Sequence, residues 1–149
     1  MDDQELFSTA AITSFRLNGQ FLAIAEELAA PAGLTAAWWQ VLGAVLAEPL
    51  PVAGIAREMG ITRQSVQRIA DLLVAKGLCE YRPNPAHRRA KLVAATEEGR
   101  AAVHQINPQH AAIARKLAAA LGPTQFAATV TTLTHLSTVL DTIVTEGTP

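Results

Sequence analysis

The chain has 149 residues, half of them hydrophobic and 17% charged, which is enough apolar material for one folded domain and too little charge for a disordered chain. Its single cysteine excludes an internal disulfide and suits a reducing compartment. The net charge of −1 alone argues against a nucleic-acid binder, but residues 57–91 hold eight basic and three acidic residues, a local charge of +5. The remainder holds four basic and ten acidic residues, so the sequence predicts a basic module within an acidic body.

The start of the chain and its uncharged stretches bear on location. Met1–Glu5 is acidic, unlike the basic start and apolar run of a secretion signal. Residues 28–47 and 117–140 lack charged side chains, but Pro and Gly interrupt both, which is not typical of a membrane span. We therefore expect a cytoplasmic protein with no membrane partner.

The first half of the chain is predicted to be helical. Apolar residues at helical spacing indicate a helix over about 4–30, which Pro31 and Gly33 end. Thr35 can cap a second helix, and Thr62 can cap a longer one that Gly77 ends. The predicted segments are a helix at 36–47, a linker at 48–51, a short helix at 52–59 ending at Gly60, and a helix at 63–76.

The periodicity changes after Gly77. Residues 78–82 and 91–95 indicate two strands, joined by a polar hairpin loop at 83–90. Thr96 and the glutamates after it begin a helix that runs to about Leu121, and we expect Pro108 to bend it. A last helix covers about 123–145. The predicted fold class is mainly α with a small β-wing.

The pair of helices around Gly60 has the features of a helix-turn-helix. Ala56 is the small residue where the second helix crosses, and Gly60 suits a turn that needs positive φ. Val66, Ile69 and Leu73 fall on one face of the second helix, so its other face is directed outward. That outward face carries Arg63, Gln64, Gln67 and Arg68, joined by the small polar Ser65.

These outward residue types suit the major groove of DNA. Arginine can pair with guanine O6 and N7, and glutamine with adenine N6 and N7. Hydroxyl groups at the helix start can bind phosphate oxygens, and arginines on an adjacent hairpin can enter a flanking minor groove. The predicted DNA-binding residues are Thr62, Arg63, Gln64, Ser65, Gln67, Arg68, His87, Arg88, Arg89 and Lys91.

Residues 34–99 carry a set of short motifs in a fixed order. These are Leu34–Thr35, Trp39–Leu42, Val52–Ala56, Met59–Gly60, Thr62–Arg68, Gly77–Leu78, Asn84–Lys91 and Thr96–Gly99. In this pattern the chain resembles the MarR family of bacterial winged-helix regulators. The resemblance implies a single MarR-like domain over 1–149, with a winged helix-turn-helix lobe at 34–99 that binds DNA.

The resemblance also implies an assembly and a mode of control. It implies a homodimer on double-stranded DNA with a pseudo-palindromic operator, held together by dimerisation helices at about 4–30 and 108–145. It implies a transcriptional regulator, usually a repressor, released by a small and often phenolic ligand that binds between the dimer helices and the DNA-binding lobe. Trp38 and Trp39 are candidate contacts for such a ligand, although core packing explains them equally well.

The sequence departs from the family pattern in the wing. The family commonly has Asp-x-Arg there, with the carboxylate orienting the arginine. His87 stands at the aspartate position and Arg89 at that of the arginine. A neutral imidazole could accept a hydrogen bond from Arg89, whereas a protonated one could instead bind phosphate.

The alternatives to a DNA-binding regulator are a protein-interaction module and a thiol-based redox sensor. A winged helix used for protein contacts would not need the outward arginines and glutamines, and a redox sensor would need Cys79 exposed with a low pKa. His104, His110 and His135 lack metal-ligand spacing. No nucleotide loop, Ser/His/Asp or Cys/His constellation is apparent, so we expect no enzyme, no metal and no cofactor.

Overall fold

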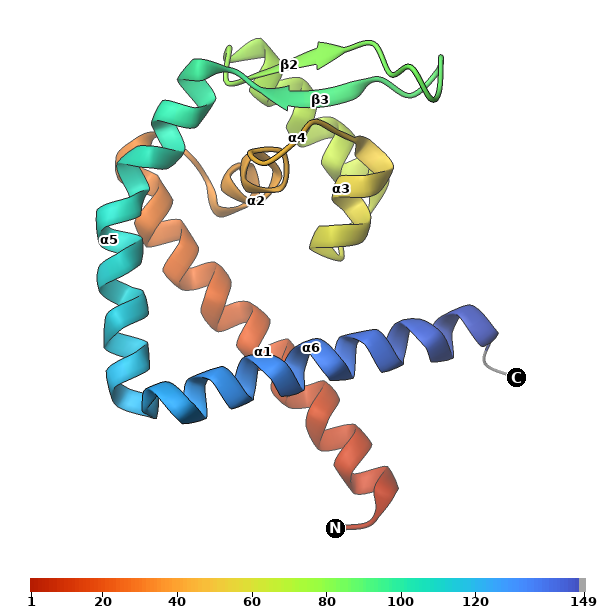
Figure 1. Ribbon diagram of the computed structural model, residues 1–149, viewed down its shortest axis with the longest axis vertical. Helices are drawn as coiled ribbons and strands as arrows, with labels where there is room; N and C mark the ends of the chain where they lie inside the picture. Colours follow the sequence, from red (N-terminus) through yellow and green to blue (C-terminus); the bar gives the residue numbers. More distant parts are fainter. Residues whose placement is uncertain (148–149) are drawn as a thin grey trace. The chain divides into compact units, whose positions relative to one another are not determined.

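The computed structural model describes residues 1–147 and shows a mainly helical chain with a small antiparallel sheet (Figure 1). The chain divides into two compact units, Met1–Asn107 and Pro108–Pro149. The elements in chain order are α1 (Asp3–Ala29), η1 (Ala30–Ala32), α2 (Ala36–Ala44), β1 (Leu50–Pro51), α3 (Val52–Met59), α4 (Arg63–Ala75), β2 (Cys79–Arg82), β3 (Leu92–Ala95), α5 (Glu97–Leu121) and α6 (Pro123–Glu146). No helix within residues 1–147 combines the length and apolarity that crossing a membrane requires.

The helices begin and end largely where local signals predict. The Asp2 carboxylate accepts from the backbone N–H of Glu5 at 2.8 Å, and the Glu5 carboxylate accepts from that of Asp2, so the two form a capping box for α1. Gly60 has the left-handed φ of 66° that allows the chain to turn sharply between α3 and α4. The second helix, expected at 36–47, ends one turn earlier at Ala44. Pro108 lies inside α5, and the expected bend there stays a prediction.

The sheet contains a strand that the sequence did not reveal. Residues 48–51 were expected to be a linker, but Leu50 and Pro51 form β1 and pair antiparallel with β3, opposite Val93 and Leu92. The strand order is β1-β3-β2, so β1 lies at an edge. An edge strand tolerates a proline, which cannot donate a ladder hydrogen bond. The linker prediction was therefore wrong for these two residues.

One hydrophobic core holds the first unit together. Residues from α2, the position after its end, α3, α4, β3 and α5 supply its largest fully buried side chains, which are Leu42, Ile55, Leu73, Ile106, Val41, Val45, Val66 and Val93. Each such side chain contributes about 1.5–3 kcal/mol when fully buried. This core fixes α4 against α2 and α3, and therefore fixes which face of α4 meets solvent.

The second unit has a different character. None of its described residues is buried, although α6 carries an apolar stripe. Large apolar side chains that are 39–50% exposed recur along this helix at Val130, Leu133, Leu140 and Ile143. Seven threonines of α6 each donate their hydroxyl to the carbonyl four residues earlier, as Thr134 does to Val130 at 2.8 Å. These hydroxyls are thereby satisfied within the helix, which makes the surface of α6 compatible with burial.

Candidate nucleic-acid interface

Helix α4 presents its polar face to solvent, as its spacing predicts. Val66, Ile69 and Leu73 are buried on the inner face. Arg63, Gln64, Gln67 and Arg68 are all exposed on the outer face.

The first turn of α4 is held by a side-chain cap. The Thr62 hydroxyl oxygen accepts from the backbone N–H of Ser65 at 3.1 Å, and the Thr62 hydroxyl also donates to the Ser65 hydroxyl oxygen at 3.0 Å. Loss of such a cap costs about 1 kcal/mol. Thr62 therefore stabilises the helix start with its own hydroxyl. Ser65 keeps a hydroxyl proton that a phosphate oxygen can accept.

The hairpin loop between β2 and β3 is shaped by short backbone turns. The Asn84 side-chain oxygen accepts from the backbone N–H of Ala86 at 3.0 Å, and the Asn84 carbonyl accepts from that of His87 at 3.1 Å. The side chains of His87, Arg88 and Arg89 are exposed. His87 makes no side-chain hydrogen bond to Arg89, so the imidazole does not orient this arginine as a carboxylate would.

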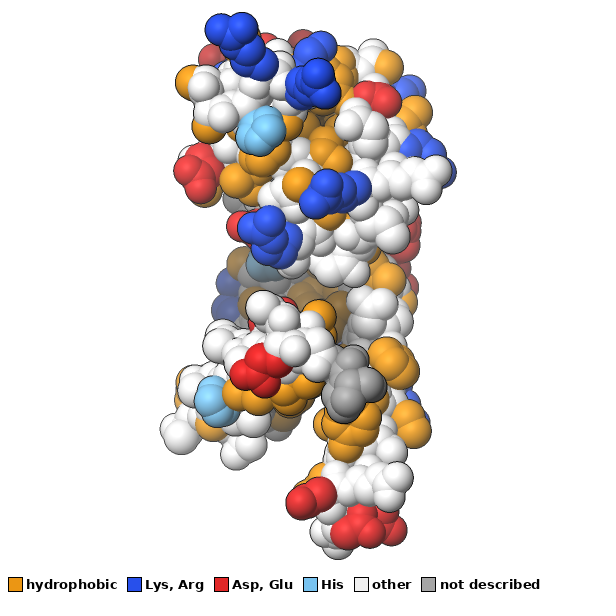
Figure 2. All heavy atoms as spheres, turned by 90° about the vertical axis from the view of Figure 1, so that its right-hand side faces the viewer, with side chains coloured by type: hydrophobic (Ala, Val, Ile, Leu, Met, Phe, Trp, Pro, Cys, Tyr) orange, Lys and Arg blue, Asp and Glu red, His pale blue; other side chains and the backbone are white. Residues whose placement is uncertain are grey.

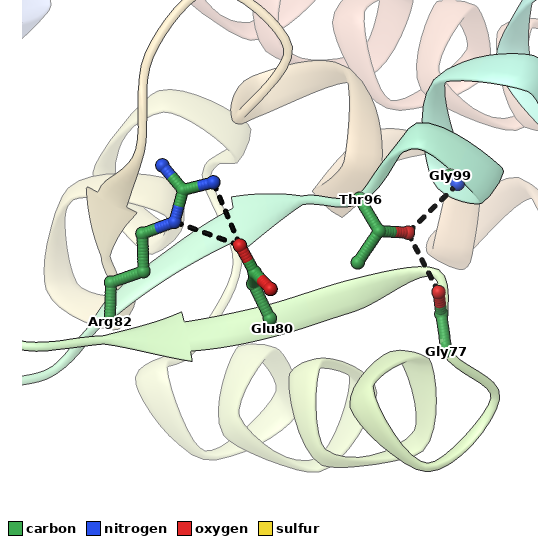
Figure 3. Close-up of polar contacts among 5 residues, drawn as sticks. All are labelled: Gly77, Glu80, Arg82, Thr96 and Gly99. Atoms are coloured by element: carbon green, nitrogen blue, oxygen red, sulfur yellow. Dashed lines mark hydrogen bonds and ion pairs between the residues drawn. The ribbon is translucent and has the colours of Figure 1, made fainter.

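The arginines of the basic module fall into two groups. Within residues 1–147, the side chains of Arg57, Arg63, Arg68, Arg88 and Arg89 take part in no hydrogen bond or ion pair. By contrast, the Arg82 guanidinium donates to the Glu80 carboxylate at 2.7 Å and 2.9 Å (Figure 3). We call the four of these that lie on α4 and the hairpin loop, Arg63, Arg68, Arg88 and Arg89, the unpaired arginines.

The unpaired arginines have no internal anion to neutralise them. Figure 2 shows Lys and Arg side chains gathered on the face of the lobe that carries α3 and the end of the hairpin. Such a cluster attracts polyanions and supplies the cations that neutralise phosphates.

A groove of about 630 Å³ lies between α4 and the wing. Its lining combines side chains from β1, the start of α3, α4, β2 and the hairpin loop: Pro51, Val52, Ala53, Arg63, Gln64, Gln67, Asp71, Tyr81, Arg89, Ala90 and Lys91. The groove therefore joins the predicted reading residues of α4 to Arg89 and Lys91 of the wing on one continuous surface.

Two residues in this groove were absent from the sequence prediction. Tyr81 donates its hydroxyl to the Asp71 carboxylate, and the Gln67 amide nitrogen lies 3.0 Å from both the Asp71 Oδ1 and the Tyr81 hydroxyl oxygen. Burial, and then the hydrogen bond to Asp71, raise the pKa of Tyr81 to about 12, so the phenol stays protonated at neutral pH. The four-residue spacing of Gln67 and Asp71 on one helix could have indicated their contact. Tyr81 comes from another element and left no such signal.

The wing is anchored at its base by Thr96. The Thr96 hydroxyl donates to the Gly77 carbonyl at 2.7 Å and accepts from the backbone N–H of Gly99 at 3.1 Å (Figure 3). A Cβ atom at Gly99 would lie 2.1 Å from the Leu78 carbonyl oxygen, closer than any real contact. Only glycine therefore lets the start of α5 approach the chain that leaves α4, at the end of the wing where β2 begins and β3 ends.

The remaining candidate residues lie away from the groove. Cys79 is 2% exposed, and its burial raises the pKa of the thiol to about 11. A redox sensor requires an exposed thiol of low pKa, so the structure argues against that alternative. Trp38 and Trp39 are half-buried and pack against the core, and neither lines the groove beside α4.

The geometry defines a winged helix-turn-helix: α3 and α4 meet at a glycine turn, and a three-stranded sheet with a basic hairpin follows. Comparison with known proteins agrees. A family model described as the MarR family matches residues 32–90. An uncharacterized protein of Mycobacterium tuberculosis is 39% identical over 126 residues, covering 85% of this chain and 88% of that protein.

Two solved structures are similar over most of the chain. BpsR of Bordetella bronchiseptica, whose DNA binding is regulated by 6-hydroxynicotinic acid, is 26% identical with a TM-score of 0.74, covering 87% of this chain and 98% of BpsR. The transcriptional repressor CouR, bound to a 23-mer DNA duplex, is 25% identical with a TM-score of 0.75, covering 92% of this chain and 98% of CouR. The chain belongs to the MarR family of transcription regulators, and its fold is that of DNA-binding regulators rather than of enzymes.

Proposed function

We propose that the protein is a homodimeric, sequence-specific repressor of transcription that binds a pseudo-palindromic operator. In this proposal, the outer face of α4 enters the major groove and the hairpin loop follows the adjacent minor groove. The observation that carries the proposal is the set of unpaired arginines on α4 and the hairpin, because cations without internal partners remain available to phosphates and base edges. The similar repressor CouR was solved bound to a 23-mer DNA duplex, which supports binding to double-stranded DNA.

A second copy of the chain would cover the exposed apolar side chains at both ends of the sequence. α1 exposes Phe7, Phe15 and Phe21 by 67%, 74% and 58%, and α6 carries the apolar stripe described above. Exposed apolar surface on this scale is typical of an interaction surface. We therefore assign dimerisation to helices at about 4–30 and 108–145, and DNA binding to the lobe at 34–99.

Release by a small aromatic ligand is the finer part of the proposal. Regulation of BpsR by 6-hydroxynicotinic acid supports an aromatic acid or phenol as the ligand class. Trp38 and Trp39 are its proposed contacts, since both are only half-buried.

The proposal is tested by capturing the protein's own DNA. Purified protein is mixed with sheared DNA from its source genome, and the retained fragments are sequenced. We expect a recurring inverted repeat whose half-sites lie about one helical turn apart. A labelled duplex of that sequence should bind more than about 1000-fold more tightly than an unrelated duplex. Retention of fragments without any shared sequence would contradict sequence-specific binding.

The ligand is tested with the same labelled duplex. We expect 6-hydroxynicotinic acid or a simple phenolic acid to release the DNA and to change the fluorescence of the two tryptophans in the absence of DNA. If neither compound class changes the tryptophan fluorescence or the DNA affinity, the ligand part of the proposal is wrong while repression itself stands.

A further inference from the structure

Gln67 is the residue on the outer face of α4 whose functional group is held by other side chains. Its amide nitrogen lies 3.0 Å from Asp71 Oδ1 and 3.0 Å from the Tyr81 hydroxyl oxygen. The Tyr81 hydroxyl itself donates to the same Asp71 oxygen. Gln64, one turn earlier on the same helix, makes no side-chain hydrogen bond within residues 1–147.

These contacts determine which way the Gln67 amide points. A carboxylate oxygen can only accept, so the amide must direct N–H rather than its own oxygen toward Asp71. Since the two acceptors are hydrogen-bonded to each other, they lie side by side and share one N–H of the amide. The other N–H and the Oε1 oxygen remain without partners in the described chain. Gln67 thus presents one donor and one acceptor from a fixed amide.

A neighbouring donor and acceptor form the pattern that pairs with adenine, whose N7 accepts and whose N6 donates in the major groove. We propose that Gln67 reads an adenine in each half-site, and that Asp71 and Tyr81 are positioning residues that hold its amide ready for this contact. The proposal rests on the proposed function, in which α4 enters the major groove. It adds the base that is read and the two residues that orient the reader.

Tyr81, which contacts the Gln67 amide of α4, belongs to β2 and is itself held in place. Tyr81 lies on β2, where it pairs with Val93 of β3, so the sheet holds the backbone from which its side chain extends. The Lys91 ammonium lies 5.7 Å from the centre of the Tyr81 ring, a favourable cation–π distance. The high pKa of Tyr81 keeps its hydroxyl a donor throughout the neutral range. Gln67 is therefore ordered before DNA binds and loses less side-chain freedom on binding, which favours affinity by about fivefold.

Tyr81→Phe is the informative variant because it removes one hydroxyl and keeps the ring and the net charge. Removing Asp71 would also delete a negative charge beside DNA and strengthen phosphate attraction, which would mask the effect. Gln67→Ala, Gln64→Ala and the two double variants with Tyr81→Phe complete the set. Gln64 is the matched control, since it is a glutamine on the same exposed face without the supporting contacts.

The experiment first selects a consensus from a randomised double-stranded DNA pool with the wild-type protein. Affinities of every variant are then measured for the consensus and for duplexes changed at one base pair at a time. We expect Gln67→Ala to reduce discrimination at one A·T pair by roughly 5- to 150-fold. Tyr81→Phe should reduce discrimination at the same pair by about fivefold, and should have no further effect at that pair when Gln67 is already alanine. The effects of Tyr81→Phe and Gln64→Ala should be independent.

Several results would overturn this assignment. A Tyr81→Phe effect that is equal at all base pairs, or equally large in the Gln67→Ala background, would mean that Tyr81 only stabilises the fold. If a clear consensus is selected but Gln67→Ala discriminates between the consensus and the changed duplexes as well as wild type does, the inference is wrong and the proposed function stands. Selection of no consensus at all would overturn the proposed function and, with it, this inference.

Discussion

The winged lobe and the C-terminal unit contrast in how they treat apolar and charged side chains. The lobe buries a continuous core from Leu28 to Ile106 and leaves five arginines, Arg57 and the unpaired arginines, without partners. Between Pro108 and Gly147 no residue is buried, and α6 has only two acidic residues and no basic one. The lobe thus has a buried core of its own and exposed cations, whereas the C-terminal unit exposes its apolar side chains, which is why we propose that a second copy of the chain covers them.

A charge placed within the apolar stripe of α6 should have the strongest effect on DNA binding. Leu133→Glu places a charge in the middle of the stripe, and we expect the dimer to dissociate because burying an unpaired carboxylate is strongly unfavourable. Loss of the second half-site contact should weaken operator binding by at least about 100-fold. Sedimentation velocity and fluorescence anisotropy measure the two effects.

Gln125→Glu is the matched control for this substitution, since it adds the same charge to an exposed position near the start of α6. It should leave the protein dimeric. A Leu133→Glu protein that sediments like the control would place the dimer interface elsewhere.

A substitution at Gly99 should destabilise the winged lobe without changing any residue of α6. In Gly99→Ala the new methyl group meets the Leu78 carbonyl, and we expect the free energy of unfolding to fall by about 1–3 kcal/mol or more. Gly43→Ala is the control, because the space around Gly43 is open and alanine favours a helix there by roughly 0.5–1 kcal/mol. Urea unfolding of the two variants should therefore shift in opposite directions, and a shared direction would contradict the close approach at Gly99.

The unpaired arginines and Arg82 should differ in how much their loss weakens operator binding. Arg63→Ala and Arg68→Ala should each weaken operator binding by about 1–3 kcal/mol, because both side chains are free to contact DNA. Arg82→Ala removes the same charge from a side chain already paired with Glu80, so binding should change by no more than about twofold. Competition titrations measure these affinities, and equal losses in all three variants would mean that internal pairing does not decide which arginines bind.

The smallest effect is expected at Cys79. Because burial raises the pKa of its thiol to about 11, roughly one molecule in a thousand carries the thiolate at pH 8. Reaction with a disulfide reagent should be at least about 100-fold slower in the folded protein than in guanidinium chloride, and peroxide should leave DNA binding unchanged. Rapid labelling of the folded protein would restore the redox alternative.

The sequence predicted best where local chemistry determines structure. Thr62 and Gly60 indicated the start of α4 and the turn before it, and the spacing of Val66, Ile69 and Leu73 predicted its buried face. The exposed face of α4 follows from these signals alone.

What the sequence missed depends on contacts between distant residues. A two-residue edge strand containing Pro51 has no periodicity, so β1 looked like a linker. The contact of Tyr81 with Gln67 joins a strand to a helix across fourteen positions, and no local pattern marks it. The ion pair of Arg82 with Glu80 is different, because residues two positions apart lie on the same face of a strand and their spacing could have indicated the contact.

The salt dependence of operator binding shows whether the unpaired arginines are the cations that bind DNA. Affinity is measured by fluorescence anisotropy from about 50 to 200 mM salt for wild type, Arg89→Ala and Arg82→Ala. If the unpaired arginines neutralise DNA charge, wild type weakens steeply with salt, Arg89→Ala lowers the logarithmic slope by about 1 per subunit, and Arg82→Ala leaves it unchanged. A slope that is the same for wild type and Arg89→Ala, or that falls as much in Arg82→Ala, would contradict the assignment of DNA binding to the unpaired arginines.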